Sequence, residues 1–162
     1  MLTIFTTGGT FDKIYFDANS EFSIGEPQVK PILKEANLSL DYHIESLLKK
    51  DSLDIGDVDR QLIVDKIVSS DSRQIIITHG TDGMAATAQA IAKASIETKT
   101  IVLVGAMQPA RMRYSDAPFN LGFAVASALL LPAGIYISMN GHVFTHDNVT
   151  KNLAQARFES LS

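Results

Sequence analysis

Short β-branched segments alternate with longer segments rich in alanine and leucine along most of the chain. Five of the short segments are predicted to be strands: residues 2–6, 44–48, 74–79, 100–105 and 134–139. Three of them contain uninterrupted apolar runs, at residues 75–77, 101–104 and 135–137. Strands that are apolar at consecutive positions are typical of a sheet covered on both faces, as parallel sheets are.

Helical patterns lie between these strands. Residues 58–69 carry apolar side chains at helical spacing, with Asp57 predicted as the cap. Residues 84–95 are rich in alanine, so a helix there can pack close to a sheet. Residues 119–131 are apolar almost all round and are expected to be buried between layers. A shorter helix is expected after Pro31.

This alternation predicts an α/β fold: a doubly wound, Rossmann-like, mostly parallel sheet with helices on both faces. We expect residues 1–162 to form a single domain. In such a sheet the ligand binds beyond the carboxyl ends of the strands. Catalytic and ligand-binding residues should therefore lie directly after the strands. Residues 12–25 are polar, without a hydrophobic period, and are predicted to form a loop, either a lid or a plain surface loop.

Composition narrows the possible functions. The chain is 46% apolar and 20% charged, as globular domains are. It has no cysteine, which excludes disulfides, thiolate chemistry and cysteine-ligated zinc. A net charge of −4, spread along the chain, gives no basic surface for nucleic acid. The longest apolar stretch, 123–132, is too short to span a membrane, and residues 1–6 do not resemble a signal peptide. We therefore expect a cytoplasmic protein.

Hydroxyl groups and glycines follow the predicted strands. Residues 6–10 read Thr-Thr-Gly-Gly-Thr, and paired glycines let the backbone approach a ligand closely. Thr10 is therefore a candidate nucleophile or phosphate ligand, although a tight turn with an incidental hydroxyl fits the segment too. Residues 78–82 read Thr-His-Gly-Thr-Asp before a helix, where Thr81 or Asp82 can serve a site or simply cap the helix.

Lys151 and two histidines are the remaining candidates. A buried lysine can hold or accept a proton beside a hydroxyl, but Lys151 taken alone is more typical of solvated surface. His142 and His146 share a face of a predicted strand or hairpin. With no third ligand identifiable, we expect no metal, and no other cofactor is indicated.

Taken together, five segments resemble the bacterial L-asparaginase family of threonine amidohydrolases. They occur in the order and with the approximate spacing of that family, at residues 7–10, 78–82, 104–107, 118–121 and 149–151. The chain resembles a short form that holds only the N-terminal, site-bearing domain of the family. The resemblance implies hydrolysis of the side-chain amide of L-asparagine to L-aspartate and ammonia.

The resemblance also implies a role for each catalytic residue. Thr10 matches the nucleophile that forms an acyl-enzyme, and Tyr15 falls where short members carry a lid tyrosine that hydrogen-bonds it. Thr81, Lys151 and Asp82 match a second group of catalytic residues in the family, apart from the nucleophile. In that group Lys151 would orient or deprotonate Thr81, while Asp82 would hold the substrate's ammonium group.

The substrate-binding residues implied by the resemblance are Ser52, Asp82 and the backbone groups of Gly80 and Ala106. Leu53 departs from the family pattern, because many long members place there a polar residue that contacts the substrate. The second domain of long members, which helps hold the ammonium end in a neighbouring subunit, is also absent. We therefore expect a homo-oligomer, a dimer or tetramer, formed through residues 119–131 and 152–162.

Two other functions are compatible with the sequence. One is an inactive truncated domain kept as an oligomerisation or regulatory partner. The other is a nucleotide- or phosphate-binding module on the same sheet, although no acidic ribose anchor or phosphate-binding lysine is present at the required spacing. The expected partners are a small amino-acid amide and other copies of the chain, without nucleic acid or membrane.

Overall fold

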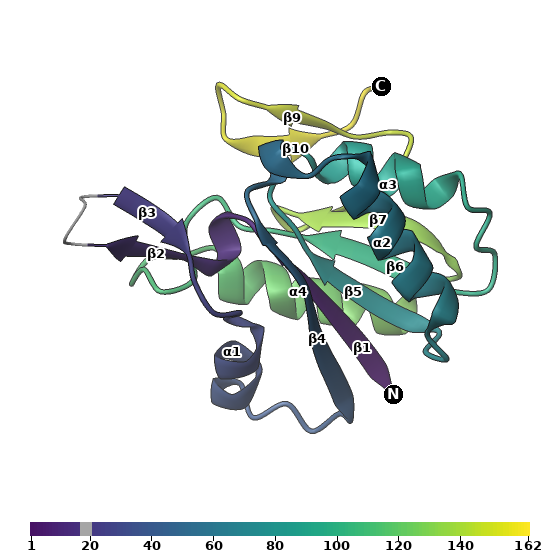
Figure 1. Ribbon diagram of the computed structural model, residues 1–162, viewed down its shortest axis with the longest axis horizontal. Coiled ribbons are helices and arrows are strands. Elements are labelled where there is room, and N and C mark those ends of the chain that lie inside the picture. Colours follow the sequence, from purple (N-terminus) through teal and green to yellow (C-terminus); the bar gives the residue numbers. More distant parts are fainter. Residues whose placement is uncertain (17–20) are drawn as a thin grey trace.

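A six-stranded sheet forms the centre of the protein. The computed structural model describes residues 1–16 and 21–162, and its strands lie in the order β4-β1-β5-β6-β7-β8 (Figure 1). The bounds are β1 Leu2–Gly8, β4 Tyr42–Lys50, β5 Gln74–Thr78, β6 Thr100–Val104, β7 Gly134–Met139 and β8 His142–Thr145. Only β8 is antiparallel to its neighbour. The predicted fold class is confirmed.

Helices cover both faces of this sheet, as Figure 1 shows: α2 and α3 lie on one face and α4 on the other. The helices are α1 Val29–Glu35, α2 Asp57–Ser69, α3 Met84–Ala92 and α4 Ala117–Leu130. Two short 3₁₀ turns follow β1 and β4, namely η1 Thr10–Asp12 and η2 Ser52–Asp54. A hairpin near the C-terminus pairs β9 (Thr150–Asn152) with β10 (Arg157–Glu159).

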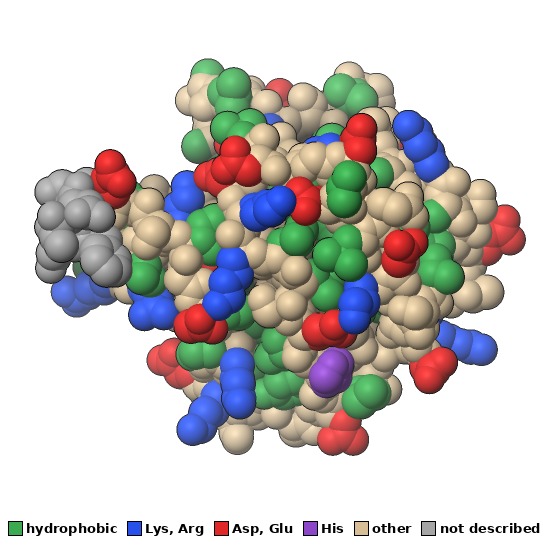
Figure 2. All heavy atoms as spheres, viewed as in Figure 1, with side chains coloured by type: hydrophobic (Ala, Val, Ile, Leu, Met, Phe, Trp, Pro, Cys, Tyr) green, Lys and Arg blue, Asp and Glu red, His purple; other side chains and the backbone are tan. Residues whose placement is uncertain are grey.

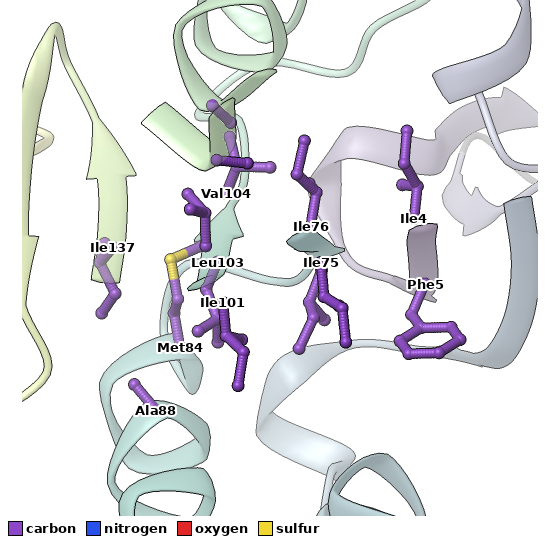
Figure 3. Close-up of a cluster of buried hydrophobic side chains, with 14 of the residues drawn as sticks. Ile4, Phe5, Ile75, Ile76, Met84, Ala88, Ile101, Leu103, Val104 and Ile137 are labelled. Atoms are coloured by element: carbon purple, nitrogen blue, oxygen red, sulfur yellow. The ribbon is translucent and has the colours of Figure 1, made fainter. Parts of the chain in front are cut away.

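The central strands are apolar on both faces because both faces are buried. Ile75, Ile76 and Ile101 are fully buried. Figure 3 shows Ile75 and Ile101 on the side of Met84 from α3, and Ile76 on the opposite side of the sheet. The uninterrupted apolar runs in the sequence therefore correspond to strands packed between two helical layers.

The predicted loop at residues 12–25 is wrong, because most of this segment is an antiparallel hairpin. Its strands are β2 (Lys13–Phe16) and β3 (Glu21–Ile24), and residues 17–20 lie outside the described part of the chain. Tyr15 pairs with Phe22 across the hairpin, with ring centroids 5.4 Å apart in an edge-to-face arrangement. Such cross-strand aromatic pairs stabilise a hairpin whose strands are too short to show a period in sequence.

The expectation that residues 119–131 are buried between layers is also wrong. One face of α4 is buried against the sheet, through Leu121, Ala124 and Ala128. The other face is exposed: 62% of Phe119 and 83% of Leu130 are accessible to solvent. An apolar sequence does not by itself distinguish a helix covered on two sides from one covered on one side only.

Smaller differences concern helix ends. Gly56, not Asp57, is the N-cap of α2, and the Asp59 carboxylate accepts a hydrogen bond of 3.1 Å from the Gly56 N–H. The predicted helix 84–95 ends at Ala92. The short helix begins just before Pro31, which lies in its first turn, where a missing N–H costs nothing.

The loops after the strands approach one another through glycines. A Cβ at Gly9 would lie 2.5 Å from the Gly80 nitrogen, and one at Gly80 would lie 2.5 Å from the Ser52 Cβ. A Cβ at Gly105 would lie 2.5 Å from the His79 carbonyl oxygen. Real Cβ atoms do not come this close to other atoms, so these positions require glycine for the loops to meet.

Asp12 connects the end of η1 to the segment after the hairpin. Its side chain is buried, its Oδ1 accepts a 2.8 Å hydrogen bond from the Gln28 N–H, and its carbonyl oxygen accepts one of 2.8 Å from the Gly25 N–H. Burial raises the pKa of Asp12 from 3.8 to about 6, against the effect of the Gln28 hydrogen bond. Both ends of the hairpin therefore meet at one buried residue, Asp12, whose carboxyl group bonds Gln28 and whose backbone carbonyl bonds Gly25.

The close contact at Gly105 gives a stability prediction. Gly105→Ala should lower the free energy of unfolding by about 1–3 kcal/mol, because the new methyl must displace the His79 carbonyl. Gly122→Ala is the control, since Gly122 lies in α4 with open space around its Cα. It should stabilise the protein by about 0.5–1 kcal/mol, as alanine does in helices. Urea unfolding measures both, and equal effects would contradict the close packing.

Asp12 gives a pH-dependent prediction. Its folded pKa is raised, so its stabilising contribution is complete below 3.8 and is lost as the pH rises through about 6. This difference corresponds to about 3 kcal/mol. Asp12→Asn keeps an acceptor oxygen but cannot ionise. Relative to wild type, its free energy of unfolding should therefore rise by about 2–3 kcal/mol between about pH 4 and about pH 7.

Urea unfolding at several pH values measures this difference. Asp71→Asn removes a solvent-exposed carboxylate and serves as the control. A constant difference between Asp12→Asn and wild type across that range would show that Asp12 does not titrate in this way.

Candidate active site

The candidate residues gather at the carboxyl edge of the parallel strands. Thr10 follows β1, Ser52 follows β4, and Thr81 follows β5. Ala106 follows β6, while Lys151 comes from β9 in the C-terminal hairpin. Figure 1 shows the two hairpins flanking this edge of the sheet. The candidate residues thus lie directly after the strands, where this type of fold binds its ligands.

Thr10 begins η1 and borders a cavity. It is partly buried, and the Gly9 before it has a φ of +73°, a conformation that favours glycine. The cavity has a volume of about 270 Å³ and lies between the hairpin and the loop after β6. Its lining residues are Thr10, Lys13, Phe22, Met107, Gln108, Pro109 and Met112. This space is open to a small molecule beside the Thr10 hydroxyl.

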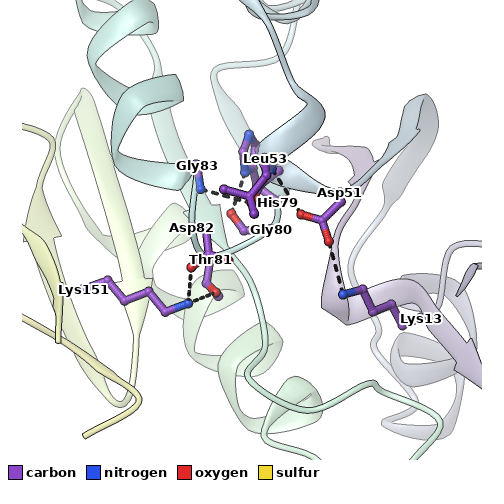
Figure 4. A network of polar contacts seen from close by, with 10 residues as sticks. Lys13, Asp51, Leu53, His79, Gly80, Thr81, Asp82, Gly83 and Lys151 are labelled. Carbon is purple, nitrogen blue, oxygen red and sulfur yellow. Dashed lines mark hydrogen bonds and ion pairs between the residues drawn. The ribbon is translucent and has the colours of Figure 1, made fainter. Parts of the chain in front are cut away.

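Thr81, Asp82 and Lys151 form a hydrogen-bonded cluster. The Lys151 Nζ donates to the Thr81 Oγ1 at 2.8 Å and to the Asp82 Oδ1 at 2.6 Å (Figure 4). Thr81 is 7% exposed, whereas the side chain of Asp82 is 42% exposed. The ammonium group is therefore held between a buried hydroxyl and a carboxylate that solvent can reach.

The C-terminal hairpin positions Lys151. Phe158 lies opposite Lys151 in the pairing of β9 with β10, and it is buried in the main core. Its N–H donates a 2.9 Å hydrogen bond to the Asn140 Oδ1 in the turn between β7 and β8. The apolar anchor and this hydrogen bond keep the hairpin against the sheet, so that Lys151 reaches Thr81, 70 residues earlier in the sequence.

Ser52 connects η2 to the start of α3. Its Oγ accepts a 3.0 Å hydrogen bond from the Gly83 N–H, and its hydroxyl donates to no other group among the described residues. Asp51 caps η2 by accepting the Leu53 N–H at 3.1 Å, and it also forms a 3.2 Å ion pair with Lys13. The Leu53 hydrogen bond first, and then Lys13, lower the pKa of Asp51.

The loop that carries Ala106 is held by two residues from the start of α4. The Asp116 carboxylate accepts the Met107 N–H at 2.9 Å. The Asn120 Nδ2 donates to the Gly105 carbonyl oxygen at 3.0 Å and to the Asp116 Oδ2 at 3.0 Å. Sequence reasoning assigned no role to either residue, although both lie in or next to a segment that resembles the family.

Tyr15 is not brought to Thr10 in this structure. Its side chain is 52% exposed, its ring packs on Phe22, and within the described residues its hydroxyl has no hydrogen bond. Sequence reasoning also gave no role to Lys13, which lines the cavity beside Thr10, or to His79, which is buried beneath Gly80. Such roles depend on contacts between distant segments, which the sequence does not show.

Two further findings bear on the class of site. Across residues 1–16 and 21–162, no three His, Asp or Glu side chains cluster as a metal site would require. In the same part of the chain, no helix is long and apolar enough to cross a membrane.

Comparisons with known proteins agree with this geometry. The chain matches the family model described as "Asparaginase, N-terminal" over residues 1–161. It is 30% identical over 165 residues to a "Probable L-asparaginase periplasmic" of Haemophilus influenzae, covering 96% of this chain and 47% of that protein. It is also 30% identical over 161 residues to "L-asparaginase 2" of Escherichia coli, covering 93% and 46%.

Solved structures show the same correspondence. The thermostable L-asparaginase from Thermococcus kodakarensis aligns with a TM-score of 0.83 at 27% identity, covering 98% of this chain and 50% of that one. A probable cytoplasmic L-asparaginase from Campylobacter jejuni aligns with a TM-score of 0.79 at 27% identity, covering 98% and 52%. The chain thus spans about half the length of these proteins. It belongs to the asparaginase family and corresponds to the N-terminal domain of its members.

Proposed function

We propose that this chain carries the catalytic site of an asparaginase-type amidohydrolase, which converts L-asparagine to L-aspartate and ammonia. The observation that carries the proposal is the Lys151–Thr81–Asp82 cluster, at the same strand edge as Thr10. A hydroxyl group that is activated by a neighbouring lysine can take part in covalent catalysis without a metal or cofactor. The L-asparaginases among the relatives support the substrate class.

The proposed reaction has two steps. The Thr10 hydroxyl attacks the side-chain amide carbon, and the hydroxyl proton passes to the amide nitrogen, which leaves as ammonia. Water then attacks the resulting ester and releases aspartate, and its proton restores the Thr10 hydroxyl. The backbone N–H groups of the surrounding glycine-rich loops provide donors for the oxyanion that forms in each step.

The second cluster orients Thr81 and holds the substrate. Lys151 orients the Thr81 hydroxyl by donating a hydrogen bond to its oxygen. The half-exposed Asp82 carboxylate binds the substrate's ammonium group, and Ser52 together with the backbone of Gly80 and Ala106 closes the pocket. A pocket of this size should favour asparagine over glutamine by at least about tenfold in kcat/KM, because one extra methylene group must find room.

The proposal extends to the assembly. Residues 1–162 form one domain, and this domain associates with other copies as a dimer or tetramer. Exposed apolar side chains on α4 support this, because contiguous apolar surface favours association. By contrast, Figure 2 shows apolar side chains scattered among charged ones on the face viewed there. The relatives' printed locations differ, so a cytoplasmic location stays a prediction.

An ammonia-release assay with asparagine and glutamine tests the activity. Thr10→Ala should lower kcat by more than about 1,000-fold without loss of fold, because the nucleophile is removed. Thr98→Ala, at an exposed position, is the control and should retain wild-type activity. Residual activity of Thr10→Ala within tenfold of wild type would refute the assignment. A folded wild-type chain that releases no ammonia would favour the inactive-domain or phosphate-binding alternatives.

Sedimentation measurements test the assembly. Leu130→Glu places a charge on the exposed face of α4. It should favour the monomer and raise the dissociation constant of the assembly by at least about tenfold. Val58→Glu is the matched control, since Val58 is 86% exposed on α2, on the opposite face of the sheet. A wild-type monomer at micromolar concentration, or equal effects of both variants, would contradict self-association through α4.

A further inference from the structure

The cavity beside Thr10 is larger than the proposed reaction requires. Its volume is about 270 Å³. The group that leaves in asparagine hydrolysis is ammonia, which is about the size of a water molecule, and a water molecule occupies about 30 Å³ in the liquid. The groups proposed to hold the rest of the substrate, Ser52, Gly80 and Asp82, are not among the described residues that line the cavity. The proposed reaction therefore leaves most of this space unused.

Thr10 lies between the cavity and the turn proposed to hold the substrate's amino-acid part. On one side, the preceding Gly9 lies against the Gly80 backbone, where a Cβ on Gly9 would be 2.5 Å from the Gly80 nitrogen. On the other side, Thr10 borders the cavity together with Lys13 and Phe22 of the β2–β3 hairpin. An acyl group held at the Gly80 turn thus leaves the cavity open on the far side of the Thr10 hydroxyl.

The same division is found elsewhere around this edge of the sheet. In the loop after β6, Ala106 is proposed to face the substrate, whereas the next residue, Met107, lines the cavity. Figure 4 shows Lys13, from the cavity wall, and Lys151, from the cluster proposed to hold the substrate, on opposite sides of the Gly80 turn. The site thus has one end for the amino-acid part of a substrate and a second end beyond the bond that breaks.

Hydrogen bonds hold one wall of the cavity in place. The Asp116 carboxylate accepts the Met107 N–H at 2.9 Å and the Gln108 N–H at 3.0 Å. The Ala110 N–H donates to the Phe11 carbonyl oxygen at 3.1 Å, which joins the loop after β6 to η1. The wall that the loop provides is therefore fixed relative to the turn that carries the nucleophile.

The side chains around the cavity are mostly apolar. Phe22, Met107, Pro109 and Met112 all contribute to its lining. Phe22 is 48% exposed and Met112 is 41% exposed, so an apolar group in the cavity would remove part of their surface from water. A mainly apolar lining with a few polar groups is typical of sites for small molecules. The cavity therefore fits a small apolar group better than it fits ammonia.

We propose that this cavity is a leaving-group site, which lets the chain hydrolyse asparagines that carry a small alkyl group on the side-chain amide nitrogen. The inference rests on the proposed function, because Thr10 is again the nucleophile. The Thr10 oxygen bonds to the amide carbon, the carbon–nitrogen bond breaks, and the nitrogen takes the hydroxyl proton and leaves as a primary amine. Water then hydrolyses the ester, which releases aspartate and restores the Thr10 hydroxyl.

The first test compares substrates with the wild-type chain. They are L-asparagine and its derivatives with a methyl or an ethyl group on the side-chain nitrogen, and release of L-aspartate measures all of them. The ethyl compound should have a kcat/KM within about tenfold of that of asparagine. Its KM should be about fourfold lower than that of the methyl compound, because one more methylene group is buried.

This comparison separates the inference from the proposed function. If asparagine is hydrolysed and the ethyl compound falls more than about tenfold below it in kcat/KM, the leaving-group site is refuted and the proposed function stands. If neither compound is hydrolysed, the proposed function fails and the leaving-group site fails with it.

Variants of the cavity wall form the second test. Met112→Trp and Gln108→Trp each place a larger side chain at the cavity from a solvent-exposed position, so one can replace the other if it does not fold. Each should lower kcat/KM for the ethyl compound at least about tenfold more than for asparagine. Arg113→Trp is the matched control, because Arg113 is exposed in the same loop and does not line the cavity. The same effect on both substrates, or an equal selective loss in Arg113→Trp, would overturn the assignment.

Discussion

The close contact between strand-end loops is the constraint on which the site depends. Gly9 lies against the Gly80 backbone, and Gly80 lies against Ser52, at distances that no side chain would allow. These contacts bring together the segments after β1, β5 and β4, which are neighbouring strands in the sheet. The hydroxyl groups of Thr10, Thr81 and Ser52 share one edge because their backbones meet there. Function and packing therefore require the same glycines.

The sheet and the two hairpins hold the residues of this edge in different ways. Thr10 and Thr81 directly follow strands whose apolar side chains are fully buried on both faces, so their positions are fixed by the core. Lys151, in contrast, comes from a short hairpin held mainly by one buried aromatic residue, Phe158. The Tyr15 hairpin is joined at its base through Asp12. Each hairpin is thus held at the sheet by a small set of contacts, whereas Thr10 and Thr81 are held by the core itself.

The sequence predicted what local patterns determine. Uninterrupted apolar runs indicated the central strands, and the motifs at residues 7–10 and 78–82 were expected at the carboxyl edge of the sheet, where the structure has them. It did not predict the hairpin, because β2 and β3 are only four residues long and are stabilised by contact between them. The burial of Asp12 and the hydrogen bonds of His79 depend on Gln28 and Thr87, and no local pattern indicates such partners.

Exposure increases across the site from the groups proposed to react to the end proposed to bind the substrate's amino group. Thr81 is 7% exposed, the Asp82 side chain 42%, and Leu53 76%. A carboxylate that solvent reaches binds an ammonium group weakly, because water and salt screen the interaction. The groups proposed to make and break bonds are therefore complete within this chain, whereas substrate affinity requires something to cover Asp82. The relatives are about twice as long as this chain. Covering Asp82 should consequently change KM more strongly than kcat.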